Sequence, residues 1–137
     1  MSLTTVHTVA DLRATVASWR AEGLRVALVP TMGALHDGHI SLTKLALEHA
    51  DRVIVSIFVN PTQFSPDEDF GAYPRTLPDD QKLLDAAGVA LCFAPSVDEM
   101  YPDGFATKVH VDGGMTNVLC GAARPGHFDG VAQIVTK

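Results

Sequence analysis

The feature that most constrains the fold is a strand–helix–strand pattern within the first 60 residues. Residues 24–29 form a short run rich in β-branched side chains, ended by Pro30, which favours a strand buried on both faces. Residues 38–49 contain no proline and no glycine beyond Gly38. They carry apolar side chains at helical spacing, which predicts a helix. Residues 52–59 predict a second strand. Because such a crossover is right-handed and joins parallel strands, we expect a parallel α/β sheet.

Elements on both sides extend this pattern. Residues 8–23 predict an amphipathic helix capped by a threonine and ended by a glycine. A long ordered loop is expected over residues 60–73. Residues 76–88 then predict a third helix with a capping box at Thr76, followed by a third strand over residues 89–93.

The last third of the chain has weaker signals. They predict a turn over residues 97–101, a possible strand over 108–111, a glycine-rich loop through Gly121 and Gly126, and a helix over 129–137.

Three parallel strands with alternating helices form about half of a Rossmann-like sheet, in which the first strand should be central. No further strand is available to pair with its other edge, and an uncovered central edge is an aggregation hazard. We therefore expect residues 1–137 to be one incomplete domain, a fragment of a longer protein.

Composition excludes several classes of protein. Ten Lys plus Arg against sixteen Asp plus Glu give a formal charge of −6, which disfavours nucleic acid and anionic membranes as partners. The longest apolar runs fall far short of the roughly 20 residues that span a bilayer, and no leader pattern is evident, so a cytoplasmic location is expected. Cys92 and Cys120 lie far apart in sequence and are expected to be free thiols.

The most informative stretch runs from Pro30 to His39, between the first strand and the first crossover helix. Ligands bind at this position in open α/β sheets. His36 and His39 are three residues apart at a helix start, so both side chains project to one side, and Gly38 permits close approach of a nucleotide. Free amides and the positive end of the helix dipole favour phosphate there, and imidazole donors suit phosphoryl chemistry. Two surface histidines on an ordinary turn, or half of a metal site that lacks further ligands, are the alternatives.

Four blocks of sequence carry a family resemblance. His36-Asp37-Gly38-His39 resembles the His-x-Gly-His signature of the nucleotidyltransferase superfamily. The longer block from Val29 to His36 resembles pantothenate synthetases, as do Phe58 to Phe64, Tyr73-Pro74-Arg75-Thr76 and Arg124 to Phe128, in order and approximate spacing. The resemblance covers about residues 3–137, essentially the whole chain.

The resemblance implies a role for each matching residue. His39, with His36, would assist adenylate formation, and Gln63 would hold pantoate and later lie near β-alanine. The ATP site would comprise Met32, Gly33, Ala34, Leu35, His36, Asp37, Gly38 and His39; the substrate site Gln63, Met32, Pro30, Thr31 and Asn60; and the vicinity of magnesium and phosphate Asp79, Asp80 and Arg124.

Structural roles compete with several of these assignments. Gln63 and Arg124 would ordinarily be solvated surface residues. Asn60 suits a turn after a strand as well as it suits a substrate contact. Asp79 and Asp80 are also expected on capping and dipole grounds alone. No fixed metal site is predicted within the protein.

The implied reaction condenses pantoate with β-alanine at the expense of Mg²⁺–ATP, through a pantoyl adenylate, in an enzyme expected to be a homodimer. Two segments of the family pattern, Gly-Glu-Lys-Asp-x-Gln and Ser-Ser-Arg, would fall beyond Lys137. Without their charges the 137 residues alone are expected to be weakly active or inactive. Another nucleotidyltransferase, or a non-catalytic fragment that serves binding or dimerisation, remains as an alternative.

Overall fold

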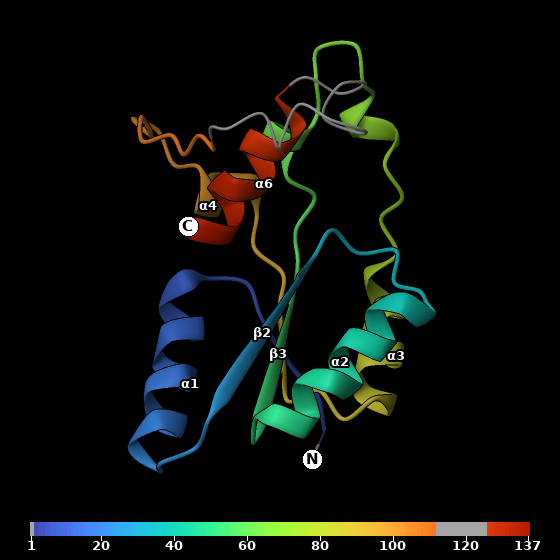
Figure 1. The fold of residues 1–137 in the computed structure, drawn as a ribbon, viewed down its shortest axis with the longest axis vertical. Helices are drawn as coiled ribbons and strands as arrows, with labels where there is room; N and C mark the ends of the chain where they lie inside the picture. The colour runs from blue at the N-terminus through green and yellow to red at the C-terminus, as the bar shows by residue number, and fades with distance from the viewer. Residues whose placement is uncertain (1, 112–125) are drawn as a thin grey trace.

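A parallel sheet with helices on both faces organises the chain, as the computed structural model shows for residues 2–111 and 126–137 (Figure 1). Within these residues the sheet has four strands in the order β1-β4-β3-β2, and every neighbouring pair is parallel. The predicted α/β, Rossmann-like fold is therefore confirmed. The strands are β1 Thr4–Val6, β2 Val26–Thr31, β3 Arg52–Ile57 and β4 Leu91–Phe93.

Helices connect and cover these strands. Four of the predicted helical regions are present, and the long loop after β3 contains two single 3-10 turns. The helices are α1 Val9–Ala21, α2 Asp37–His49, α3 Leu77–Ala86, α4 Val97–Met100 and α6 His127–Thr136, and the turns are η1 Pro61–Gln63 and η2 Phe70–Ala72.

Two helix caps were predicted from the sequence, and one of them is present in the structure. Thr8 accepts a hydrogen bond from the Asp11 amide at 3.2 Å, as predicted for the start of α1. The capping box predicted at Thr76 is wrong, because Thr76 makes no side-chain cap bond. Its backbone (φ −126°, ψ 43°) is not extended, and its hydroxyl instead donates to the Asp80 carboxylate at 3.2 Å.

Alternating side chains of the strands feed two cores, one on each face of the sheet. Val29, Val53 and Val55 pack with Leu84 of α3 and with partly buried residues of α2. On the other face the buried cluster is Ile54, Phe58, Leu91, Phe93 and Met100, against which the apolar side of α1 packs. The two-residue period of the strands therefore directs one set of side chains to each helical layer.

The prediction for the first strand was wrong in two respects. β2 lies at the edge of the sheet formed by the described residues, as expected for a strand without a further partner, but Leu28 is 57% exposed rather than buried. The strand also continues through Pro30 to Thr31. The Thr31 carbonyl accepts from the Phe58 amide of the neighbouring chain segment, so the Pro30 nitrogen faces the open edge, where no ladder bond is lost.

Two further elements differ from expectation. β1, which pairs with β4, was not predicted, because three residues are too few to show a period. The possible strand at 108–111 is absent. The Gln133 side chain of α6 accepts from the Val109 amide and donates to the Thr107 carbonyl, so this backbone bonds to a side chain instead of a strand. Gly121 and Cys120 lie outside the described residues.

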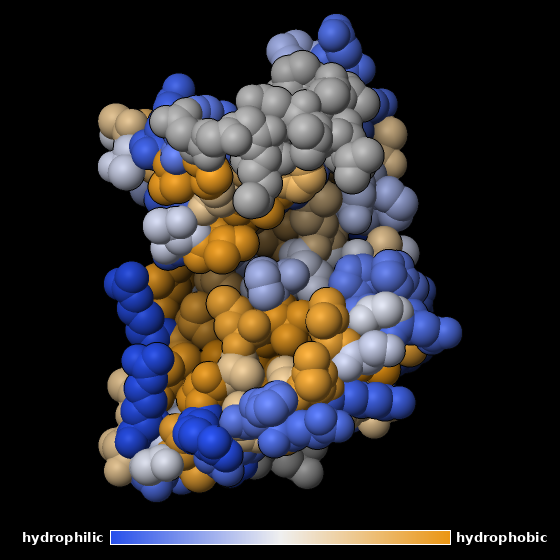
Figure 2. Space-filling view, in the orientation of Figure 1, coloured by the Kyte–Doolittle hydropathy of each residue, from blue (hydrophilic) through white to orange (hydrophobic). Residues whose placement is uncertain are grey.

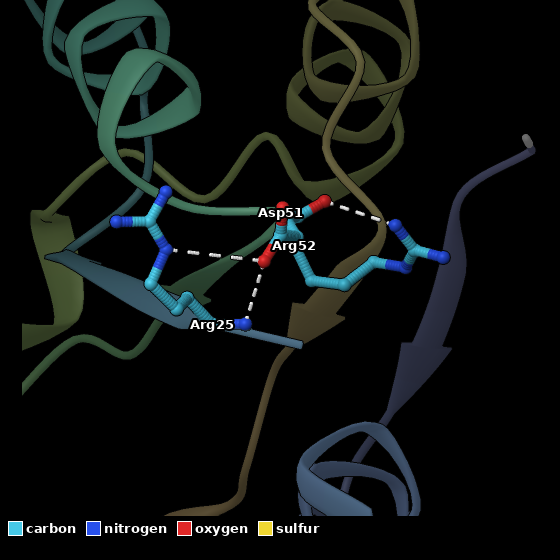
Figure 3. Close-up of polar contacts among 3 residues, drawn as sticks. All are labelled: Arg25, Asp51 and Arg52. Atoms are coloured by element: carbon cyan, nitrogen blue, oxygen red, sulfur yellow. Dashed lines mark hydrogen bonds and ion pairs between the residues drawn. The ribbon is translucent and has the colours of Figure 1, made fainter. Parts of the chain in front are cut away.

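The amino ends of β2 and β3 are tied together at the edge away from the loops that follow the strands. The Asp51 carboxylate accepts from the Arg25 amide at 2.8 Å, and Arg52 donates to the Asp51 carbonyl at 3.0 Å (Figure 3). The first of these bonds joins the residue before β2 to the residue before β3, whereas the second stays within one segment.

Two further predictions concern the state of the cysteines and the presence of membrane-spanning helices. Cys92 is a free thiol, and burial raises its pKa to about 11, so it is inert as a nucleophile at neutral pH. Among the described residues no helix has the length and apolar character to cross a bilayer.

Candidate active site

The candidate residues gather at the carboxyl ends of β2 and β3. The turn of residues 32–36 leaves β2, the loop with η1 leaves β3, and α6 lies over both (Figure 1). Because parallel strands end at the same edge, segments far apart in sequence meet there.

The turn after β2 has a strained backbone. Gly33 has φ 81° and Ala34 has φ 50°, two successive residues in the left-handed region. For alanine this conformation costs about 1–2 kcal/mol. Thr31 supports the first part of the turn, since its hydroxyl donates to the Ser56 carbonyl at 2.8 Å and accepts from the Gly33 amide at 3.2 Å.

Asp80 supports the second part of the turn from α3. Its two carboxylate oxygens accept from the Ala34 amide at 3.0 Å and the Leu35 amide at 2.9 Å. The side chain is 2% exposed. Charge-assisted bonds of this kind offset the backbone strain at Ala34.

The two histidines form the N-terminal cap of α2. His36 Nδ1 accepts from the Gly38 amide at 3.0 Å, and His39 Nδ1 accepts from the His36 amide at 3.2 Å. Their rings are in contact, with centroids 4.1 Å apart and planes tilted by 39°. Because each Nδ1 accepts a bond, the neutral rings carry their proton on Nε2, which makes each Nε2 a donor.

Glycine at position 38 is required by this arrangement. A Cβ atom there would lie 2.8 Å from Cε1 and 3.0 Å from Nδ1 of His36. The glycine of the His-x-Gly-His pattern therefore makes room for the capping imidazole as well as for any ligand.

Burial lowers the pKa of His39 below 6.5, the neighbouring His36 lowers it further, and the Asp80 carboxylate partly opposes both effects. At neutral pH His39 is therefore a neutral donor through Nε2. Folding stability from this group is complete above pH 6.5 and decreases as the pH falls through the lowered pKa, because the folded state resists protonation.

Replacing His36 with alanine is expected to raise the pKa of His39, because it removes the like-charged neighbour. The pKa is measured by following the His39 imidazole signals in a pH titration by NMR. His7→Ala, at the start of the chain, is the control and should leave the titration of His39 unchanged. A His39 pKa unaffected by His36→Ala would contradict the contact between the two rings.

Gln63 is held in place by the buried side chain of Asn60. The Asn60 amide is fully buried, and its Nδ2 donates to Gln63 Oε1 at 3.0 Å. Its Oδ1 accepts from the Thr62 hydroxyl and from the Tyr101 hydroxyl, at 2.8 and 2.9 Å. Asn60 thus holds the η1 loop from within, and Gln63 is 8% exposed.

Helix α6 packs directly on the η1 loop that carries Asn60 and Gln63. Asn60 Nδ2 also donates to the Gly130 carbonyl at 3.1 Å, and His127 Nδ1 lies 2.9 Å from the Gln63 carbonyl oxygen. A Cβ atom on Gly130 would lie 2.4 Å from the Thr62 carbonyl oxygen. The contact between α6 and η1 therefore requires glycine at this position.

One cleft joins these features. It has a volume of about 310 Å³, and both His39 and Gln63 line it. Apolar side chains gather on the same face over β2, below α6 (Figure 2). The lining comprises Pro30, Thr31, Met32, His39, Ser56, Phe58, Gln63, Tyr73, Val131, Ile134 and Val135.

The structure brings most of the candidate residues into or beside this cleft. His36 contacts His39 at its rim, whereas Asp37 and Asp79 are exposed on their helices. Arg124 lies outside the described residues. The sequence reasoning missed the apolar wall from α6, although Val131, Ile134 and Val135 recur at helical spacing.

A second, larger cavity of about 440 Å³ lies beside the first and shares Met32 and Phe58 with it. In the described part of the chain, no three His, Cys, Asp or Glu side chains are grouped to hold a metal ion.

Comparison with known proteins gives consistent matches. The pantothenate synthetase of Paramagnetospirillum magneticum is 63% identical over 132 residues, which are 96% of this chain and 46% of that protein. The pantothenate synthetase of Rhodospirillum rubrum is 57% identical over 136 residues, 99% of this chain and 48% of that protein. The chain thus spans about half the length of the curated relatives it matches.

Solved structures agree with these matches. Pantoate-beta-alanine ligase from Francisella tularensis, complexed with beta-gamma ATP and beta-alanine, superposes with a TM-score of 0.90 at 39% identity, covering 98% of this chain and 51% of that one. Pantothenate synthetase from Thermus thermophilus gives a TM-score of 0.86 at 52% identity, covering 96% of this chain and 46% of that one.

The family described as Pantoate-beta-alanine ligase matches residues 4–137, nearly the whole chain. Together with the cleft at the carboxyl ends of β2 and β3, this match shows that the chain belongs to the pantoate-beta-alanine ligase family.

Proposed function

We propose that this chain forms the ATP- and pantoate-binding part of a ligase that joins pantoate to β-alanine through a pantoyl adenylate. The observation that carries the proposal is that His39 and Gln63 line one cleft at the sheet edge where α/β proteins bind ligands. The Francisella tularensis relative was solved with beta-gamma ATP and beta-alanine, which supports these two ligands. Residues 1–137 would be the N-terminal part of the nucleotide-binding domain.

The histidines would act on the phosphates. Each neutral ring presents Nε2–H, with Nδ1 already engaged by the helix cap. His39, with His36 beside it, would donate to oxygens of the α-phosphate and the leaving pyrophosphate as negative charge develops there. The positive end of the α2 dipole would favour the same anion, whereas the Gly38 amide, which the sequence predicted to be free, is already bonded to His36. Met32, Gly33, Ala34, Leu35, Asp37 and Gly38 would complete this wall of the ATP site.

Gln63 would hold the acid. Its Oε1 accepts from Asn60, so the amide is oriented, and its Nε2 would donate to the hydroxyl or carboxylate groups of pantoate. Met32, Pro30 and Thr31 would line the same pocket, and Asn60 would act by fixing the loop. The apolar side chains from α6 suit the methyl-bearing carbon skeleton of pantoate.

The reaction requires no covalent intermediate with the protein. The pantoate carboxylate would attack the α-phosphorus of ATP and release pyrophosphate, and the amine of β-alanine would then attack the acyl carbon, release AMP and lose a proton. The protein's contribution would be orientation and charge stabilisation.

Mg²⁺ would neutralise the triphosphate. Such an ion is usually held by one or two carboxylates together with substrate phosphates, so we propose that it arrives with ATP. Asp79, exposed in the first turn of α3, and Arg124 are the side chains we propose near it. A homodimer stays a prediction from the family resemblance, which sedimentation analysis tests, and a cytoplasmic location stays a prediction from the apolar pattern of the sequence.

The proposal is tested by pantoate-dependent ATP–pyrophosphate exchange. We would exchange the 132 matching residues of the Paramagnetospirillum magneticum enzyme for this chain, which supplies the remaining length of a relative. Exchange is expected with pantoate. It is not expected with the phosphorylated compounds to which other nucleotidyltransferases transfer a nucleotide. The 137-residue protein alone is expected to exchange weakly or not at all. Activity only with a phosphorylated acceptor would favour another nucleotidyltransferase instead.

A further inference from the structure

The turn that carries the two histidines is held by a side chain distant in sequence. Asp80 lies 46 and 45 residues after Ala34 and Leu35, whose amides donate to its two carboxylate oxygens. Successive amides in left-handed backbone form an anion-binding concavity, which phosphate groups occupy in many proteins. Here a carboxylate of the protein itself fills it.

The carboxylate is buried and accepts three hydrogen bonds from the protein, at the wall of the 440 Å³ cavity. Besides the two amides, Oδ1 of Asp80 accepts from the Thr76 hydroxyl at 3.2 Å. The side chain is 2% exposed, and a Cβ atom at Gly33 would lie 3.2 Å from Oδ2. A metal ion held by this carboxylate would compete for the oxygens that already accept the amides of the turn. The exposed neighbour Asp79 has no such constraint.

The amide bonds connect Asp80 to the histidines through one residue. Leu35, fixed by Asp80, is followed directly by His36, the N-cap of α2. The His36 amide then donates to His39 Nδ1, so the position of the His36 backbone sets the orientation of the His39 ring. Asp80 is also one of the charged groups that acts on His39, the other being His36.

We propose that Asp80 is a positioning residue that sets the orientation of His36 and His39 through the backbone of residues 34 and 35, and not a ligand of magnesium. This inference rests on the proposed function for its effect on catalysis. Its structural part concerns the protein without any ligand.

The first measurement follows the imidazole nitrogens by NMR in the 137-residue protein, for Asp80→Asn and for Asp85→Asn. Asp85 is the matched control because it lies on the same helix, loses the same charge and also accepts one backbone amide bond, from Leu3. Asp80→Asn should shift the His36 and His39 signals and lower the pKa of His39, because Asp80 raises it. Asp85→Asn should change neither.

The second measurement is the exchange rate in the chimera described above. Asp80→Asn is expected to lower kcat about 10- to 100-fold, since small misplacements of catalytic groups have effects of this size, while the half-saturating Mg²⁺ concentration stays the same. Histidine signals and kcat equal to those of the unsubstituted protein would overturn the proposal. So would a raised Mg²⁺ requirement with unchanged histidine signals.

If Asp80→Asn does not fold, Thr76→Val keeps the carboxylate and removes only the hydroxyl bond. It should move the same histidine signals by less, without the lowered pKa of His39 because the charge of Asp80 is kept, and unmoved signals would overturn the proposal. Should the unsubstituted chimera show no pantoate-dependent exchange, the proposed function fails, and the NMR comparison still decides the role of Asp80.

Discussion

Replacing His39 with alanine is expected to lower pantoate-dependent ATP–pyrophosphate exchange by about 10²- to 10³-fold, the usual cost of removing one preorganised donor to a developing oxyanion. The reason is that His39 lines the cleft and presents Nε2–H, with its Nδ1 bound to the His36 amide. The rate is measured in the chimera at saturating ATP and pantoate.

His49→Ala is the matched control for this substitution. His49 lies in the last turn of the same helix and is exposed, so its loss should leave exchange unchanged. His39→Gln keeps an N–H donor and is expected to retain more activity than His39→Ala. Near-normal exchange in His39→Ala would refute the role assigned to this histidine.

Replacing Gly130 with alanine is expected to destabilise the protein and weaken pantoate binding together. The new Cβ would lie 2.4 Å from the Thr62 carbonyl oxygen and 2.8 Å from the Gln63 nitrogen, so α6 or η1 must move. Overpacking of this kind costs about 1–3 kcal/mol. Alanine gains at most about 1 kcal/mol in helix propensity, so the overlap outweighs the gain.

Urea denaturation measures the loss of stability, and calorimetric titration measures pantoate binding. Thr136→Ala, at an exposed position of α6, serves as the control and should alter neither. A Gly130→Ala variant as stable as the unsubstituted protein, with the same affinity for pantoate, would mean that α6 does not pack on the η1 loop that carries Gln63.

Local pattern was sufficient to predict the central part of the site. The crossover from β2 through α2 to β3 has strong periodicity, and it places the His36 and His39 pair at a helix start. Their reciprocal capping was not predicted, because His is not among the usual N-cap residues.

Contacts between distant segments were not predictable in this way. The bonds from Asp80 to the turn span 45 and 46 residues, and those from Asn60 to α6 span 70. In the sequence, Asp80 is an acidic residue near a helix start, where such residues are common, and Asn60 follows a strand. Gly130 is a residue of low helix propensity within a helix. Only the three-dimensional arrangement gives each one a partner.

The error over β2 has a physical origin as well. An apolar run predicts burial on both faces only where helices cover both faces, and within the described residues β2 is the edge strand, on which Leu28 is 57% exposed. Leu42 and Leu45 of α2 are also at least half exposed. Periodicity indicates which residues are suited to a core and does not specify their neighbours.

The most direct test of the shared cleft is an NMR titration of the isotopically labelled 137-residue protein with pantoate, followed by ATP. We expect pantoate to shift the Gln63 side-chain amide saturably and ATP to shift the imidazole signals of His39, with Thr136 and His49 unaffected. Binding of either compound that leaves both Gln63 and His39 unmoved, or no binding of either, would contradict a site built from the turn after β2 and the loop after β3.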